Sequence, residues 1–115
     1  MTVDPPFGGE ATDLSLAEVL AAAAEDLPDV TAAATADGTT TWSRGGAPFA
    51  VLADAGAEFR LDPLVARAAL RTPETQVSIR GADWIVFAPA ILDEGAVDRA
   101  EAWFLSAYRR TSARR

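Results

Sequence analysis

The stretch VTAAATADGTTTWSRGGAPFAVLADAGAEFRL, residues 30–61, decides the fold of this chain. Short runs rich in β-branched, aromatic and other apolar residues are divided by the turn signals Asp37-Gly38, Gly45-Gly46 and Asp54 to Gly56. Asp-Gly between two such runs is typical of a tight β-hairpin. The pattern predicts an antiparallel meander of four strands joined by short turns. These strands are expected at Val30–Thr35, Thr39–Arg44, Phe49–Ala53 and Glu58–Leu61.

Helical periodicity lies on both sides of this meander. Upstream, Ser15 and Glu18 have the spacing of a capping box. Apolar residues then recur at helical spacing as far as Leu27, and Pro28 ends the run. Downstream, Asp62-Pro63 predicts the cap and first turn of a second helix that reaches Arg71. One face of this second helix is predicted to carry Leu64, Val65, Ala68 and Ala69.

The last third of the chain predicts two more strands and a helix. Residues Thr75–Arg80 alternate, which places Val77 and Ile79 on one face, and Trp84–Ala88 forms the facing arm. Asp93 is the expected cap of a final helix that reaches about Arg110. Its inward positions are predicted to be Val97, Ala100, Trp103, Phe104 and Ala107.

The predicted order is α-β-β-β-β-α-β-β-α, with strands grouped rather than alternating with helices. This grouping is typical of the α+β class, and we expect a single layer of mostly antiparallel sheet with helices packed on one face. A chain of 115 residues corresponds to one domain. We expect it to span residues 14–110, between a flexible N-terminal tail at 1–13, which is rich in proline and glycine, and a frayed C-terminus at 111–115.

The amino-acid composition limits the kinds of functional site that the chain can form. The chain has no cysteine and no histidine, which excludes disulfides, thiolate or imidazole metal sites and histidine-based catalysis. Its net charge is −7 and its ten basic residues are all arginine. This acidic field disfavours non-specific attraction to nucleic acid and to anionic membranes. No signal peptide or bilayer-spanning segment is evident, so a cytoplasmic protein without membrane contact is expected.

Several patches of this sequence, in this order, resemble the MmcQ/YjbR-like family, whose fold is of the frataxin (CyaY-like) type. The patches are Leu27-Pro28-Asp29-Val30, the glycine-led run from Gly45 to Leu52, Phe59-Arg60-Leu61-Asp62-Pro63, and Asp83-Trp84-Ile85-Val86. The resemblance covers about Leu14 to Arg109.

The resemblance implies DNA binding through basic groups on the exposed sheet and its turns. Arg60 lies where the family has a basic residue at a strand end, and Arg80 lies near a second such position. The chain departs from the family at Pro48, where a lysine is usual, and lacks the histidine and lysine usual before the tryptophan.

The candidate binding residues are the arginines and tryptophans of the predicted sheet, which we expect on one open face: Trp42, Arg44, Arg60, Arg80 and Trp84. Arginine beside aromatic rings suits single-stranded nucleic acid. Tryptophan also commonly lies in cores, so whether these tryptophans are buried stays open at this point.

Two other chemistries have weaker support in the sequence. The carboxylates of Glu18, Glu25, Asp26 and Asp29 could in principle face a cation, and Asp62 with Glu74 could form a catalytic pair. No nucleophile motif or phosphate loop accompanies them, so no catalytic residue, metal site or cofactor is predicted. The sequence favours a non-enzymatic module that binds a protein partner, a second copy of itself or a small ligand on the open sheet face. Nucleic-acid binding is the alternative.

Overall fold

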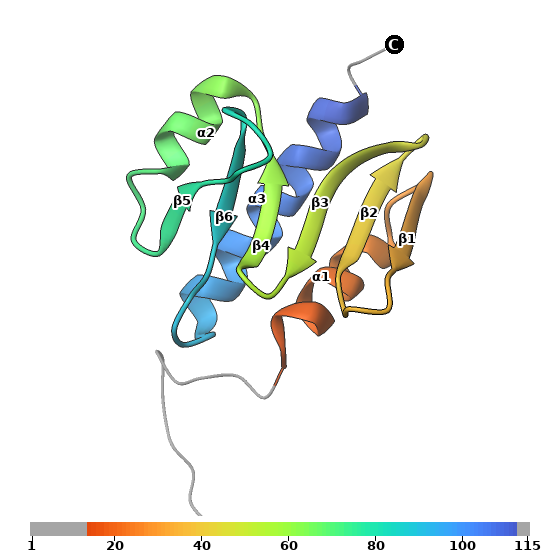
Figure 1. The fold of residues 1–115 in the computed structure, drawn as a ribbon, viewed down its shortest axis with the longest axis horizontal. Coiled ribbons are helices and arrows are strands. Elements are labelled where there is room, and N and C mark those ends of the chain that lie inside the picture. The colour runs from red at the N-terminus through yellow and green to blue at the C-terminus, as the bar shows by residue number, and fades with distance from the viewer. Residues whose placement is uncertain (1–13, 113–115) are drawn as a thin grey trace, which may run out of the picture.

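The computed structural model describes residues 14–112 and confirms the predicted fold class and element order. Six antiparallel strands form one sheet in the order β1-β2-β3-β4-β6-β5. Helices α1 and α3 run behind this sheet in Figure 1, and no helix within residues 14–112 covers the face toward the viewer, which we call the uncovered face. The elements are α1 (Leu16–Glu25), β1 (Val30–Ala34), β2 (Thr40–Arg44), β3 (Ala47–Ala53), β4 (Gly56–Arg60), α2 (Pro63–Ala69), β5 (Thr75–Val77), β6 (Trp84–Phe87) and α3 (Glu94–Ser112).

Side-chain caps fix where the helices begin. The Ser15 hydroxyl accepts the Glu18 amide of α1, and the Glu18 carboxylate accepts the Ser15 amide, which completes the predicted capping box. The Asp62 carboxylate accepts the Leu64 amide, with Pro63 in the first turn of α2. Each cap satisfies an amide that lacks a partner within its helix.

The core fills the space between the sheet and α3. Phe104 is fully buried, with its ring centroid 5.5 Å from that of Trp42 and 5.1 Å from that of Phe49. Trp103 covers the other half of the sheet and lies 5.1 Å from the ring of Phe87. The long helix therefore holds both halves of the sheet through edge-to-face aromatic contacts.

A bulge in β3 adjusts which side chains enter this core. Trp42 is paired with Ala50 but the next residue, Ser43, is paired with Pro48, so Phe49 is an extra residue in β3. Phe49 and Ala50 are consecutive, yet both belong to the buried cluster under the helices. Pro48 lies beside the irregularity, where a missing ladder donor is tolerated.

The structure differs from the sequence predictions in several details. Strand β5 ends at Val77 instead of Arg80. Helix α2 buries Ala66 and Ala69 and leaves Leu64 70% exposed, because its inward face is one of small residues. The predicted fraying from residue 111 is wrong at its start, since α3 continues to Ser112 and the buried Thr111 hydroxyl donates to the Ala107 carbonyl. The predicted tail at 1–13 and residues 113–115 lie outside the described residues.

Candidate functional site

The five sequence-predicted binding residues do not share one face. Trp42 is 3% exposed and packs against Phe104, so it is a core residue. Arg44 also turns toward the helices: its guanidinium lies 3.8 Å from the ring centroid of Tyr108 and donates to the Tyr108 carbonyl oxygen. The hypothesis of a single five-residue surface is therefore corrected, because alternation along β2 directs positions 42 and 44 into the covered side.

Arg44 has a structural role instead. Besides accepting from Arg44, Tyr108 donates its hydroxyl to the Pro28 carbonyl oxygen at the exit from α1. The arginine, the tyrosine and the proline form a clamp, here called the Tyr108 clamp, that joins the end of α3 to β2 and to the segment before β1. An arginine held over an aromatic ring at a helix C-terminus also complements the helix dipole.

Arg60, Arg80 and Trp84 gather on the half of the sheet formed by β4, β6 and β5. Phe59 and Ile85 are paired and both enter the core, so the pair that follows, Arg60 with Trp84, points to the uncovered face. Arg80 comes from the loop between β5 and β6, and its guanidinium lies 5.7 Å from the ring centroid of Trp84. The structure thus brings together three of the five predicted residues.

Glu58 lies beneath this group and was not singled out from the sequence. It occupies the uncovered face of β4, yet it is only 6% exposed. The Arg80 Nε donates to the Glu58 Oε1 at 2.9 Å, and the Ser78 hydroxyl donates to the same oxygen. An acidic residue at an outward strand position is ordinarily solvated, so the sequence gives no reason to expect that Glu58 is buried. Its position between Ala57 and Phe59 indicates only that its side chain points away from the core. The pairing anchors the β5–β6 loop on the sheet.

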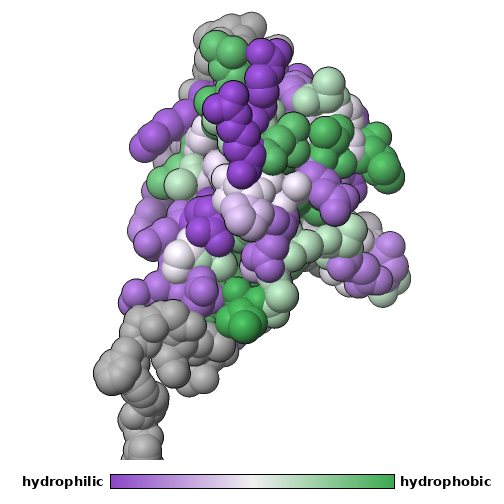
Figure 2. Space-filling model, turned by 90° about the vertical axis from the view of Figure 1, so that its left-hand side faces the viewer, coloured by the Kyte–Doolittle hydropathy of each residue, from purple (hydrophilic) through white to green (hydrophobic). Residues whose placement is uncertain are grey.

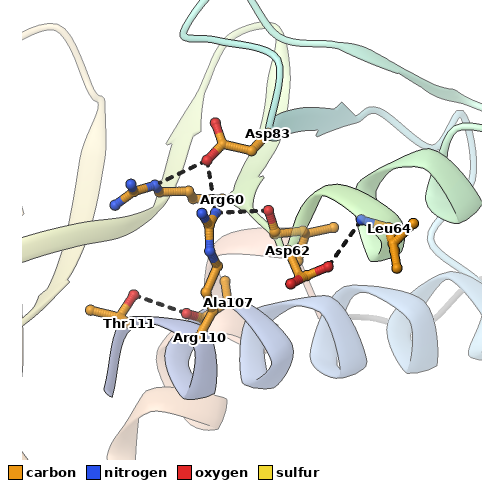
Figure 3. Close-up of polar contacts among 8 residues, drawn as sticks. Arg60, Asp62, Leu64, Asp83, Ala107, Arg110 and Thr111 are labelled. Carbon is orange, nitrogen blue, oxygen red and sulfur yellow. Dashed lines mark hydrogen bonds and ion pairs between the residues drawn. The ribbon is translucent and has the colours of Figure 1, made fainter. Parts of the chain in front are cut away.

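A second group of ion pairs lies at the C-terminal end of β4 (Figure 3). Asp83 accepts from the Arg60 Nε at 3.4 Å and from an Arg110 terminal nitrogen at 2.8 Å, and Arg110 also donates to the Leu61 carbonyl. The hydrogen bond from Arg110 is the main cause that lowers the pKa of Asp83 below its usual value of 3.8. Arg60 and Arg80 are thus each paired with a carboxylate, which reduces the positive potential that they present.

The lowered pKa predicts an acid-sensitive contribution to stability. Because the folded-state pKa of Asp83 lies below its unfolded value, the contribution is complete above about pH 4 and is lost as the pH falls through the folded-state pKa. We expect Asp83→Asn to lower the free energy of unfolding by at most about 1 kcal/mol at pH 7. The difference from the parent chain should shrink in urea titrations carried toward pH 2. An Arg110→Gln background should remove most of this pH dependence, and an unchanged dependence there would contradict the assignment.

Apolar side chains are exposed at the same end of the molecule. Ile79, in the loop after β5, is fully exposed at 103%, and Val77 is 58% exposed. Figure 2 shows this end, with hydrophobic groups projecting at the upper right, which is the side of the uncovered face. Val77 is paired with the buried Ile85, so its side chain lies on the other side of the sheet from Trp84. We call Ile79, Arg80 and Trp84 the β5–β6 patch.

The structure gives little support to the metal site and the catalytic carboxylate pair considered from the sequence. Asp62 accepts the Leu64 amide and Glu74 accepts the Ala90 amide, so each carboxylate satisfies the backbone. Within residues 14–112, no group of three or more His, Cys, Asp or Glu side chains is placed to hold a metal ion. Two grooves, of about 360 and 310 Å³, lie on the helix side and are lined mainly by α1. Of the helices in the described part of the chain, none is both long and apolar enough to cross a bilayer.

The chain matches no family model, no curated protein and no solved structure. The class is therefore given by the fold itself: an α+β domain with one open antiparallel sheet and helices on one face. The β5–β6 patch is the part of its described surface where an exposed apolar side chain, an arginine and a tryptophan lie together.

Proposed function

We propose that this domain is a non-enzymatic binding module that receives a protein partner on the uncovered sheet face, at the β5–β6 patch. The observation that carries the proposal is the fully exposed Ile79 beside an arginine that lies over Trp84. Tryptophan and arginine are enriched among the residues that dominate protein–protein binding energy. An exposed isoleucine next to them adds apolar area that a partner would remove from water.

The charges favour a protein over a nucleic acid. Arg80 is paired with Glu58, and Arg60 shares Asp83 with Arg110, so carboxylates offset part of the positive charge that these arginines would present to a phosphate. The chain as a whole carries −7, which repels a polyanion at long range. A small ligand is also less favoured, because the two grooves seen among residues 14–112 lie on the opposite, helix-covered side. The rival with a specific observation in its favour is single-stranded nucleic acid, through the arginine over Trp84.

A photo-crosslinking residue at position 79 of the full chain, expressed in its own host, tests the proposal. We expect a discrete protein adduct, because a partner seated on the patch contacts this exposed side chain. The matched control places the same residue at Ala102, an exposed position of α3 on the helix side. Equal adducts at both positions, or none at 79, would contradict the proposal.

Substitution within the patch gives a quantitative version of this test. Ile79→Glu is expected to reduce recovery of the crosslinked partner by a tagged bait at least about tenfold, while the melting temperature changes little, because an exposed side chain contributes little to stability. Fluorescence anisotropy with labelled oligonucleotides at low and moderate salt is the companion measurement. Oligonucleotide binding that weakens steeply with salt and is lost in Arg80→Ala would overturn the protein-partner proposal in favour of nucleic acid.

A further inference from the structure

The two edges of the sheet are protected to very different degrees. Edge strand β5 has only three residues, follows Pro73 and begins after Glu74, whose backbone has a positive φ of 69°. Edge strand β1 has five residues and lies at the outer edge on the right in Figure 1. Natural proteins guard edge strands with prolines, charges or bulges. Residues 30–36 contain none of the charged residues or prolines that would do this.

The ladder between β1 and β2 shows which backbone groups of β1 point outward. The Thr35 amide donates to the Thr39 carbonyl and the Gly45 amide donates to the Asp29 carbonyl, so positions 29 and 35 face β2. Inward and outward groups alternate along a strand. The amides and carbonyls of Val30, Ala32 and Ala34 therefore point away from β2, toward the edge of the sheet that no other described strand pairs with.

This edge is complementary to a second copy of itself. With Ala32 on a two-fold axis, Val30 lies opposite Ala34 of the second copy, and each of the three facing pairs makes two backbone hydrogen bonds. Asp29 then lies opposite Thr35 of the second copy. A shift of this register by two residues, which centres it on Ala33, would place Asp29 opposite Asp37 and repel. The acidic residues beyond the two ends of the strand thus disfavour this shift.

A groove accompanies the edge on its helix side. It has a volume of about 310 Å³, and Val30 and Ala32 form its β1 wall while Trp42 also lines it. In the register centred on Ala32, Ala34 of the second copy lies beside Val30 at the rim of this groove. Side-chain burial would therefore supplement the backbone hydrogen bonds. The remaining lining residues come from α1 and its exit: Ala21, Ala24, Glu25 and Leu27.

We propose that two copies of this chain associate through β1 in antiparallel fashion, with Ala32 on the two-fold axis, to form one continuous sheet. The helices of both copies lie on the same side of that sheet, since the axis is perpendicular to it. This interface uses the edge opposite the β5–β6 patch and does not depend on the proposed function. Because each copy carries −7, added salt strengthens the association by screening repulsion.

The absence of cysteine from the chain allows a single-site crosslinking test. Facing residues at a hydrogen-bonded position of antiparallel strands have Cα atoms about 5.5 Å apart, within reach of a disulfide. We therefore expect Ala32→Cys to form a covalent dimer rapidly under mild oxidation. In the matched control Ala36→Cys, the two thiols are displaced by eight residues, or about 27 Å. Equal rates for the two variants, or no dimer from Ala32→Cys, would overturn the proposed register.

Sedimentation of proline and lysine variants completes the test. Ala32→Pro removes an outward amide without removing a β1–β2 hydrogen bond, so it should abolish the dimer and keep the circular dichroism spectrum of the parent chain. Ala34→Lys, at an exposed position, should do the same by placing a charge on the edge. A parent chain that is monomeric up to millimolar concentration in moderate salt, or variants that still dimerise, would refute the proposal. The adduct at position 79 should survive in both variants, which separates this result from the test of the partner surface.

Discussion

Phe104→Ala is expected to lower the free energy of unfolding by about 3–5 kcal/mol, the cost of deleting a fully buried aromatic ring. Phe104 stands between Trp42 of β2 and Phe49 of β3, with ring centroids at 5.5 and 5.1 Å. Its removal leaves a cavity that these rings cannot close, because both strands are fixed by their ladders. For a domain of this size the loss corresponds to a fall in melting temperature of about 12–20 °C.

Urea denaturation followed by circular dichroism measures this loss, and the matched control is Ile79→Ala. That control also shortens a large apolar side chain, but at a fully exposed position, so its effect should stay within about 0.5 kcal/mol. If Phe104→Ala and Ile79→Ala cost the same, the ring is not the centre of the core and the assignment of covered and uncovered faces fails.

Gly56→Ala is expected to cost about 3 kcal/mol or more, through backbone strain and steric overlap together. Gly56 opens β4 with a φ of +133°, a conformation that L side chains rarely adopt. A methyl group there would lie 2.6 Å from the Phe87 carbonyl oxygen and 3.0 Å from the Ala88 side chain. That carbonyl belongs to the neighbouring strand and cannot yield without disturbing the ladder.

Gly46→Ala separates the two causes. Gly46 also has a positive φ, +86°, but open space surrounds the position where its Cβ would lie. This variant should show the strain alone, about 1 kcal/mol. Equal unfolding free energies for the two alanine variants would mean that the approach of the β3–β4 turn to Phe87 imposes no constraint.

The elements of the fold could be predicted from the sequence because their signals are local. The capping box at Ser15, the turn at Asp37-Gly38 and the Asp62-Pro63 helix start are each specified within a few residues. Strand order does not depend on local signals. Strand β6 lies between β4 and β5, and the sequence of Trp84–Phe87 does not indicate which strands it pairs with. The α2 face was predicted wrongly because its small inward residues carry a weaker apolar signal than the exposed Leu64.

The predicted binding surface failed where side-chain direction depends on tertiary structure. Trp42 and Arg44 are residue types that often form binding surfaces. Whether their side chains point to the core or to solvent depends on which face of the sheet α3 covers. Arg80 and Trp84 were grouped correctly, since a short loop joins them. Glu58 was missed because its burial comes from Ser78 and Arg80, about twenty residues further along the chain.

The Tyr108 clamp has a consequence for the synthesis of this protein. It connects Tyr108 of α3 to Pro28 and Arg44, and α3 also covers Phe49 and Phe87. A nascent chain that has emerged only as far as β6 holds a complete set of strands whose apolar side still faces water. The meander can pair as it leaves the ribosome, but the native core cannot form before α3 has been synthesised. The native core therefore forms only after α3 has left the ribosome, and until then the exposed apolar side of the sheet can associate with other apolar surfaces.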